Sequence, residues 1–309
     1  MISGGLNQEG VYKLKVNVDK YNTIDLEKCP HILIGGSTGS GKSYLMKNML
    51  CDVLKSGEAK VMVLDPKSVD YKFLENSRKL EWDSEGNEST DVKDKWLYRG
   101  IWLGDRDSID SFQALDELKL LVKEMYKRYS YMKQFGYIDW QEVMNEWNQS
   151  ELGAILDNEE QEGRRPFGNK RIVLFVDELA DLIYWDREKT KEKLVGWETD
   201  REAEGLEVQL GVYEMMEQSE WKMLRGNVEG CLVKLSILGR AAGIHLVLGT
   251  QRPDAQVLSG QLRANLPCRI CLRVSNNMER RIILGMSGEG HEREMVYQSK
   301  YTPLVRELR

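Results

Sequence analysis

Short apolar runs recur along this chain, and several of them end in Gly, Asp or Thr. The runs are HILIGG (31–36), VMVLD (61–65), GIWLGD (100–105), RIVLFVD (171–177), IHLVLGT (244–250) and RICLRV (269–274). Runs that stay apolar throughout are typical of strands buried on both faces of a sheet. Between several runs apolar residues recur every three or four positions, as over 115–132, which predicts helices. The alternation predicts an α/β fold with a mainly parallel central sheet flanked by helices.

The first run leads directly into a glycine-rich loop, Gly36-Ser37-Thr38-Gly39-Ser40-Gly41-Lys42-Ser43. This loop matches the phosphate-loop pattern G-x-x-x-x-G-K-[S/T]. Its glycines let backbone N–H groups turn toward phosphate oxygens, and the helix expected over 43–54 presents its positive amino end. Lys42 is expected to bridge the β- and γ-phosphates, and the Ser43 hydroxyl to ligate Mg²⁺. We therefore assign 36–44, which includes Tyr44, to binding ATP with Mg²⁺; the alternative is a strand-to-helix turn that binds nothing.

A pair of acids follows the fourth apolar run, at Asp177 and Glu178. An apolar strand delivers its last side chains to the carboxyl edge of the sheet, where ligands of open α/β folds collect. Asp177 is expected to hold Mg²⁺ through water, and Glu178 to orient or deprotonate the attacking water. The alternative is that both acids only stabilise the first turn of the next helix.

Composition limits the class of protein. The chain has 309 residues, 41% of them hydrophobic, and a formal net charge of −6. That length suits one large domain or two small ones. No apolar stretch approaches the roughly 18 residues needed to cross a bilayer, and the amino terminus lacks the pattern of a secretion signal. Five cysteines without an export signal favour a reducing compartment, so the cytoplasm is the expected location.

Cys268 and Cys271 are the one pair whose spacing suggests a metal site. No second pair of cysteines or histidines lies nearby in the sequence to complete four ligands. Residues three apart on a strand also point to opposite faces of a sheet. The sequence therefore argues against a metal site in CRIC.

Two segments differ from the rest in composition and are predicted to be insertions outside the sheet, near 137–168 and 186–229. Residues 139–162 contain eight Asp or Glu and no Lys or Arg, so the remainder of the chain carries a net charge of +2. Residues 186–229 are polar and rich in Glu. The acidity of the chain is therefore concentrated in one stretch.

Further motifs go beyond a general nucleotide-binding pattern. They are CPHILIGGSTGSGKS (29–43), LDPK (64–67), MYKRYSYMKQFG (125–136), VDELADL (176–182) and GRAAGIHLVLGTQRPDAQVLSGQLRANLPCRICLRVS (239–275). In these motifs, and in their order, the chain resembles the FtsK/SpoIIIE family of motor ATPases, within the HerA/FtsK superfamily. The resemblance implies a RecA-like P-loop NTPase fold over 29–309, preceded by a lead-in segment over 1–28. It also implies a homo-hexameric ring that couples ATP hydrolysis to movement of double-stranded DNA, or of protein in the secretion branch.

The resemblance assigns roles to two further residues. Gln251 is expected to be the sensor that touches the γ-phosphate or the attacking water, for which a neutral amide is suited; the alternative is a turn residue before Pro253. Arg240 aligns with an arginine that reaches into the neighbouring subunit's site, where it would neutralise charge on the γ-phosphate. Arg269 is a competing candidate, and either arginine could instead pair with a local carboxylate.

The cargo is the least constrained part of this hypothesis. The 63 positions from Asp177 to Arg240 exceed what we expect for DNA-pumping members, and no carboxy-terminal winged-helix pattern is present. We therefore expect a bare motor or one domain of a larger protein, with any membrane or secretion components reached through other segments or chains. A DNA translocase for segregation, conjugation or phage and plasmid transfer is the leading hypothesis, with candidate contacts at Arg252, Gln256 and Arg263. A motor for a type VII-like protein secretion system is the alternative.

Overall fold

A computed structural model describes most of the chain. The residues it describes are 14–67, 70–71, 97–103, 111–146, 152–155, 170–183, 192–201, 207–215, 218–254, 257–285 and 304–307. Within these ranges, no helix combines the length and apolar character needed to span a bilayer.

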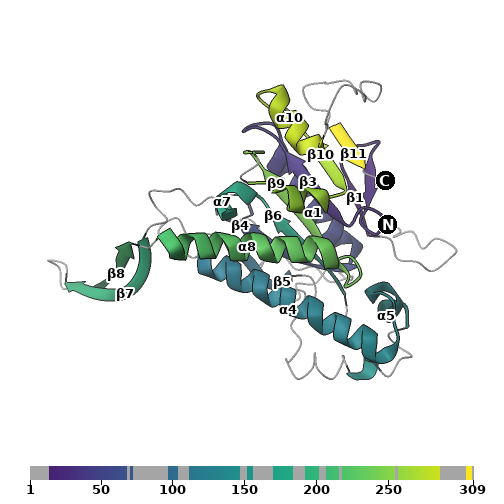
Figure 1. The fold of residues 1–309 in the computed structure, drawn as a ribbon, viewed down its shortest axis with the longest axis horizontal. Helices are drawn as coiled ribbons and strands as arrows, with labels where there is room; N and C mark the ends of the chain where they lie inside the picture. Colours follow the sequence, from purple (N-terminus) through teal and green to yellow (C-terminus); the bar gives the residue numbers. More distant parts are fainter. Residues whose placement is uncertain are drawn as a thin grey trace, which may run out of the picture.

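A seven-stranded sheet forms the centre of the molecule, in the order β11-β10-β3-β9-β6-β4-β5 (Figure 1). Its strands are β3 (His31–Gly35), β4 (Ala59–Asp65), β5 (Leu97–Leu103), β6 (Arg171–Val176), β9 (Ile244–Thr250), β10 (Cys268–Cys271) and β11 (Leu304–Glu307). All neighbouring pairs are parallel except β10 and β11, which are antiparallel. The six apolar runs are the six parallel strands, so the predicted α/β class and mainly parallel sheet are confirmed.

Both faces of the sheet are covered, because alternate residues of β3, β4, β6, β9 and β10 enter different hydrophobic clusters. In β6, for example, Leu174 belongs to one cluster and Phe175 to the other. Cys268 and Cys271 are divided in the same way, which is the opposite-face arrangement expected of residues three apart on a strand. The two-sided burial explains why these strands read as continuous apolar runs.

Helix α1 (Lys42–Ser56) covers one face, together with a small antiparallel pair, β1 (Lys15–Asn17) and β2 (Thr23–Asp25). On the other face, the long helices α4 (Ser111–Phe135) and α8 (Gln218–Leu238) run side by side below the sheet in Figure 1. The shorter helices are α5 (Trp140–Glu146), α7 (Leu179–Ile183), α9 (Gly260–Ala264) and α10 (Asn277–Leu284). α9 lies within the segment that carries the candidate DNA contacts Arg252, Gln256 and Arg263.

A separate two-stranded sheet consists of β7 (Glu192–Arg201) and β8 (Glu207–Met215). It extends from the main body at the left of Figure 1. The segment 186–229 thus includes this hairpin and the first part of α8, while 137–168 includes α5. The parts of both segments outside the described ranges, and the division of the chain at residue 28, stay predictions.

Candidate nucleotide site at the carboxyl edge of the sheet

The loop between β3 and α1 has the backbone shape of an anion cradle. Gly39 and Gly41 have φ angles of 72° and 92°, in the left-handed region that favours glycine. A Cβ on Gly36 would lie 2.5 Å from the Ser40 hydroxyl oxygen, whereas one on Gly41 would meet no atom within 4 Å. The base of the loop is therefore tight, and the turn at Gly41, directly before α1, is open.

Neighbouring strand ends hold this loop in place. The Ser37 N–H donates to the carbonyl of Arg273, which follows β10 (2.8 Å), and the Ser40 N–H donates to the Ser37 carbonyl (3.0 Å). The Thr38 hydroxyl donates to Oε1 of Gln251, at the end of β9 (2.8 Å). The predicted sensor Gln251 therefore contacts the predicted phosphate loop directly.

Lys42, Ser43 and Asp177 meet at the start of α1. The Lys42 ammonium is buried and donates to the backbone carbonyl and to Oδ1 of Asp177, the latter at 3.0 Å. The Ser43 hydroxyl lies 3.3 Å from the same Oδ1. Oδ2 of Asp177 is buried and has no hydrogen-bond partner among the described residues. A buried carboxylate oxygen without a partner, next to a hydroxyl, has the chemistry of a Mg²⁺ site.

A third carboxylate joins this group, and the sequence reasoning missed it. Oδ2 of Asp70 accepts from the Ser43 hydroxyl (3.0 Å), and its Oδ1 accepts from Lys47 (2.9 Å). Burial raises the pKa of Asp70, but its hydrogen bonds from Lys47 and Ser43 outweigh burial, so the net pKa is below the usual value. Asp70 follows the LDPK motif, yet the spacing alone gave no sign that it returns to Ser43.

Asp65, the last residue of β4, fixes the segment that carries Asp70. Its buried carboxylate accepts from the backbone N–H groups of Lys67, Asp70 and Tyr71 at 3.0–3.1 Å. Burial is the main reason that the pKa of Asp65 lies above its usual value. The backbone hydrogen bond from Tyr71 lowers this pKa, and the negative charge of Asp177 raises it further. Asp65 is therefore a structural acid that positions other groups at the site.

The Glu178 carboxylate is held at the end of β6 by Thr250, Gln251 and Lys67, and its Oε1 also accepts from the backbone N–H of Ala180 at the start of α7 (3.3 Å). Oε1 accepts from the Thr250 hydroxyl (3.0 Å), and the backbone N–H of Gln251 donates to both carboxylate oxygens (2.9 and 3.0 Å). The Lys67 ammonium lies 3.6 Å from Oε2 and 3.5 Å from Asp181. Glu178 is 1% exposed, so its orientation is set by these partners and not by water.

Tyr44 is placed differently from the other residues of the predicted binding segment. It lies in the first turn of α1, and 73% of its side-chain surface is exposed. An exposed ring beside a phosphate loop is available to contact a ligand.

Arg240 does not lie at this edge. It is exposed in the turn between α8 and the amino end of β9, whereas the phosphate loop follows the carboxyl end of the neighbouring parallel strand β3. The seven residues of β9 span roughly 20 Å. Arg240 is thus separated from Lys42 of its own chain by the length of the central strands.

The competing arginine, Arg269, is buried inside the fold. It is 6% exposed and donates to the carbonyls of Leu266 (3.1 Å) and Arg263. These bonds hold the end of α9 against β10. Of the two candidates, Arg240 alone has an exposed side chain, which a trans role requires.

The candidate DNA contacts Arg252 and Arg263 differ in how exposed they are. Arg252 is exposed directly after β9, at the same edge as the phosphate loop, and Arg263 is partly buried in α9. Gln256 lies outside the described residues.

Two family models match overlapping parts of the chain. Residues 107–255 match the FtsK/SpoIIIE family, and residues 17–130 match the central domain of helicase HerA. Among curated proteins, DNA translocase FtsK of Listeria monocytogenes is 30% identical over 274 residues, and DNA translocase SpoIIIE of Bacillus subtilis is 30% identical over 268 residues. Each match covers 85% of this chain but only 26% and 25% of the relative, so the chain spans about a quarter of the length of these proteins.

Solved structures share the fold. The pCW3 conjugation coupling protein TcpA, solved as a monomer with ATPγS, has a TM-score of 0.56 and 25% identity, covering 90% of this chain and 59% of TcpA. The cytoplasmic domain of the Thermomonospora curvata type VII secretion ATPase EccC has a TM-score of 0.53 and 18% identity, covering 91% of this chain and 26% of EccC. The likeness to EccC, at 18% identity, shows the fold alone.

Proposed function

The chain belongs to the FtsK/SpoIIIE family, and from that premise we propose that it is an ATP-hydrolysing ring motor that translocates double-stranded DNA. The observation that carries this proposal is the convergence of Lys42, Ser43, Asp177 and Glu178 at one sheet edge, where Oδ2 of Asp177 has no hydrogen-bond partner in the part of the chain that the structure describes. Segregation, conjugation or transfer of phage and plasmid DNA are the processes such a motor would serve. Relatives named as DNA translocases support DNA as the cargo.

In the proposed mechanism, the phosphate loop and the amino end of α1 bind the triphosphate. Lys42 exchanges its bond to Asp177 for the β- and γ-phosphate oxygens, since a charged ligand oxygen competes with a protein carbonyl for the same ammonium. The Ser43 hydroxyl and the Asp177 carboxylate would hold Mg²⁺, with Asp70 beside them. The ion, when bound, neutralises charge on the phosphate oxygens.

Glu178 is proposed to accept a proton from the attacking water. The N–H of Gln251 and the hydroxyl of Thr250 fix the carboxylate before the reaction, so little reorganisation is needed. Gln251 is proposed to report the state of the γ-phosphate. Its backbone holds Glu178 and its side chain holds Thr38 of the loop, which connects the two groups through one residue.

Arg240 is proposed to act in the active site of a neighbouring copy. Two observations support a role across an interface. The length of β9 separates Arg240 from the phosphate loop of its own chain, and the Arg240 side chain is exposed. A closed ring, homo-hexameric by family resemblance, would bring such edges together. We also propose that 29–309 form the motor domain, with insertions near 137–168 and 186–229.

Hydrolysis measured with and without long duplex DNA tests the proposal. The chain should release phosphate from ATP with Mg²⁺, duplex DNA should stimulate that rate, and stimulation should fade as salt rises, because backbone contacts release counterions. Glu178→Gln serves as the matched control: it should bind ATP and DNA but lose hydrolysis. Turnover that is indifferent to DNA at every salt concentration would favour the protein-secretion alternative, and absence of turnover in every condition would end the motor proposal.

A further inference from the structure

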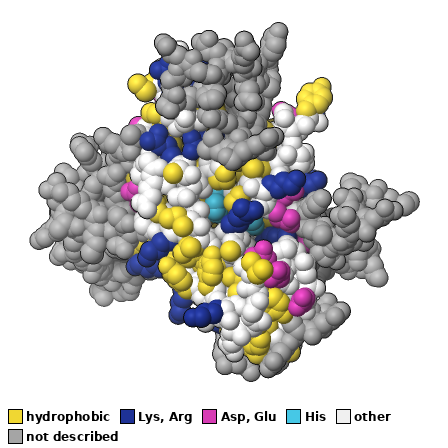
Figure 2. Space-filling view, turned by 45° about the vertical axis from the view of Figure 1, so that its right-hand side comes forward, with side chains coloured by type: hydrophobic (Ala, Val, Ile, Leu, Met, Phe, Trp, Pro, Cys, Tyr) yellow, Lys and Arg dark blue, Asp and Glu magenta, His cyan; other side chains and the backbone are white. Residues whose placement is uncertain are grey.

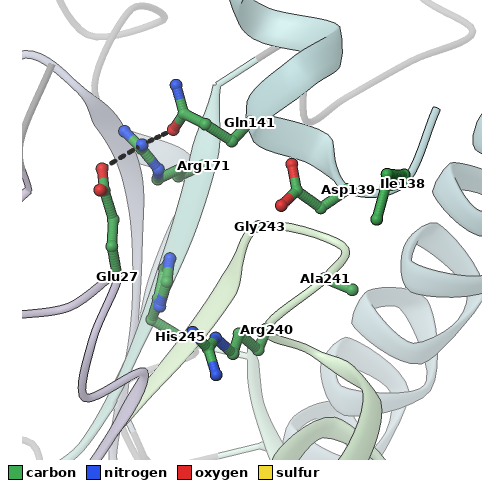
Figure 3. Close-up of a pocket in the computed structure, with 9 residues that line it drawn as sticks. All are labelled: Glu27, Ile138, Asp139, Gln141, Arg171, Arg240, Ala241, Gly243 and His245. Atoms are coloured by element: carbon green, nitrogen blue, oxygen red, sulfur yellow. Dashed lines mark hydrogen bonds and ion pairs between the residues drawn. The ribbon is translucent and has the colours of Figure 1, made fainter. Parts of the chain in front are cut away.

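A second polar pocket lies at the amino ends of β6 and β9, on the sheet edge opposite the phosphate loop (Figure 3). Its volume is about 330 Å³, and it is lined by Arg171, Arg240, His245, Glu27 and Asp139 among others. Figure 2 shows a face on which histidine, basic, acidic and hydrophobic side chains lie close together. None of the roles proposed for the nucleotide site uses Arg171 or His245.

Backbone hydrogen bonds fix the turn that carries Arg240 at one wall of this pocket. The Trp140 N–H, at the start of α5, donates to the carbonyl of Ala241 (2.8 Å), and the Gly243 N–H closes a turn onto the Arg240 carbonyl (3.0 Å). Gly243 has a φ of 68°, and a Cβ there would lie 2.9 Å from the Trp140 ring. The turn that carries Arg240 is therefore fixed against α5.

Arg171 brings an unused donor to the pocket. Its Nη2 donates to Glu27 (2.5 Å) and to Gln141, as the dashed lines in Figure 3 mark. Its Nη1 is buried and has no hydrogen-bond partner among the described residues. Since Arg171 is 2% exposed, this nitrogen faces a large desolvation penalty unless a ligand accepts from it.

His245 brings an unused acceptor. Its Nδ1 lies 3.3 Å from the Pro30 carbonyl, and because a carbonyl can only accept, Nδ1 carries the ring proton. Burial, followed by the neighbouring His31 and Arg171, lowers the pKa of His245 to about 3, so the ring is neutral at physiological pH. Its Nε2 is therefore an unprotonated acceptor, and it is buried without a partner among the described residues.

We propose that this pocket binds inorganic phosphate in its protonated form, hydrogenphosphate. The P–O⁻ oxygens accept from Nη1 of Arg171 and from the exposed guanidinium of Arg240, which has no ion pair among the described residues. The P–O–H group donates to Nε2 of His245. The volume of about 330 Å³ leaves room for the ion together with several waters, each of which occupies roughly 30 Å³.

The charges around the pocket favour an oxyanion that carries a proton. Glu27 and Asp139 offset the two arginines, so the pocket has no strong positive excess to attract every anion. Sulfate resembles phosphate in size and shape but has no proton to donate at neutral pH. It would leave Nε2 of His245 without a donor and would face the Asp139 carboxylate, whereas hydrogenphosphate can donate to either group.

The test separates this pocket from the phosphate loop. The loop is filled with a non-hydrolysable ATP analogue and Mg²⁺ in one sample and disabled by Lys42→Ala in another. Each sample is titrated with phosphate and with sulfate, while the ¹⁵N resonance of His245 Nε2 is followed by NMR and the heat of binding by calorimetry. Because the second sample needs no nucleotide, failure of the motor proposal and failure of this one are distinguishable.

Phosphate should shift the His245 resonance in both samples, with an affinity about tenfold above that of sulfate. Arg240→Gln should weaken phosphate binding by about tenfold, since it removes a charge-assisted hydrogen bond. Arg252→Gln, an exposed arginine at the opposite edge, should leave it unchanged. Asp139→Asn keeps the cap on α5 and should narrow the preference for phosphate over sulfate. Equal affinity for the two anions, no shift at His245, or equal losses from Arg240→Gln and Arg252→Gln would overturn the proposal.

Discussion

Glu178 is positioned before any ligand arrives. Two of its partners come from the end of β9, Thr250 and Gln251, and another is Lys67 in the segment after β4. The first two bonds fix where the carboxylate lies. The positive charge of Lys67 balances the negative charges of Glu178 and Asp181. A carboxylate fixed by partners from two separate segments is prepared to act as a base without rearrangement.

Lys67→Met should lower kcat for ATP hydrolysis by roughly fivefold, because the ion pair with Glu178 is partly exposed and worth up to about 1 kcal/mol. The affinity for a fluorescent ATP analogue should stay unchanged, since Lys67 is not among the residues proposed to bind phosphate. Lys55→Met, at the far end of α1, is the control and should behave as the unmodified protein. A kcat that stays constant or rises would show that Lys67 does not support Glu178.

Helix α1 begins at a backbone position that only glycine adopts easily. Gly41 has a φ of 92°, and Gly41→Ala should cost about 1–2 kcal/mol in the free energy of unfolding. Nucleotide affinity should fall as well, because strain at this position changes the direction of the loop amides. Gly260→Ala is a matched control, since Gly260 begins α9 without a positive φ and with open space around its Cα. Chemical denaturation and nucleotide titration measure both variants, and equal effects would contradict the argument.

The central strands could be predicted from the sequence because each is buried on both faces and is therefore apolar throughout. β3 and β9 show this most clearly, with every residue buried. β1 and β2 were not predicted, since each is only three residues long and gives too short a pattern. At the site, the motif spacing brought Lys42, Asp177 and Glu178 together correctly. The contact of Asp70 with Ser43 depends on how the segment after β4 turns back, which no local pattern specifies.

His31 and His245 lie on the adjacent strands β3 and β9, and both are buried. Burial, together with the charge of Arg240, lowers the pKa of His31 to about 3, as burial does for His245. Because the unfolded chain protonates both rings near pH 6.5, it binds more protons than the folded chain below that value. The resulting stability is present above pH 6.5 and is lost as the pH falls toward 3.

Stability should therefore decline by about 2 kcal/mol for each ring between pH 8 and pH 5. NMR of the imidazole nitrogens checks the cause: neither ring should titrate between pH 8 and pH 5 in the folded protein. Phosphate is left out of the buffer, so the proposed ligand of the second pocket does not affect the signals. Titration of either ring near pH 6.5 would contradict the burial argument.

The two edges of the central sheet carry different chemistry. The carboxyl edge holds the phosphate loop and its acids, while the amino edge holds Arg240 and the second pocket. A single copy cannot bring Arg240 to its own nucleotide, because β9 separates them by roughly 20 Å. If Arg240 acts on ATP, hydrolysis requires a second copy whose amino edge faces the first copy's carboxyl edge. Such a head-to-tail contact is the kind that closes into rings.

Mixing two inactive variants tests this requirement. Lys42→Ala disables the phosphate loop but leaves Arg240, and Arg240→Ala does the reverse. In equal, random mixtures about a quarter of the interfaces combine an intact loop with an intact neighbouring arginine, so hydrolysis should recover in part. Mixing Lys42→Ala with Glu178→Gln is the control: every subunit then carries a defect in its own site, which no neighbour can repair, so the mixture should stay inactive. Assembly is followed by light scattering, and assembled mixtures of Lys42→Ala and Arg240→Ala without activity at any ratio would rule out a trans role for Arg240.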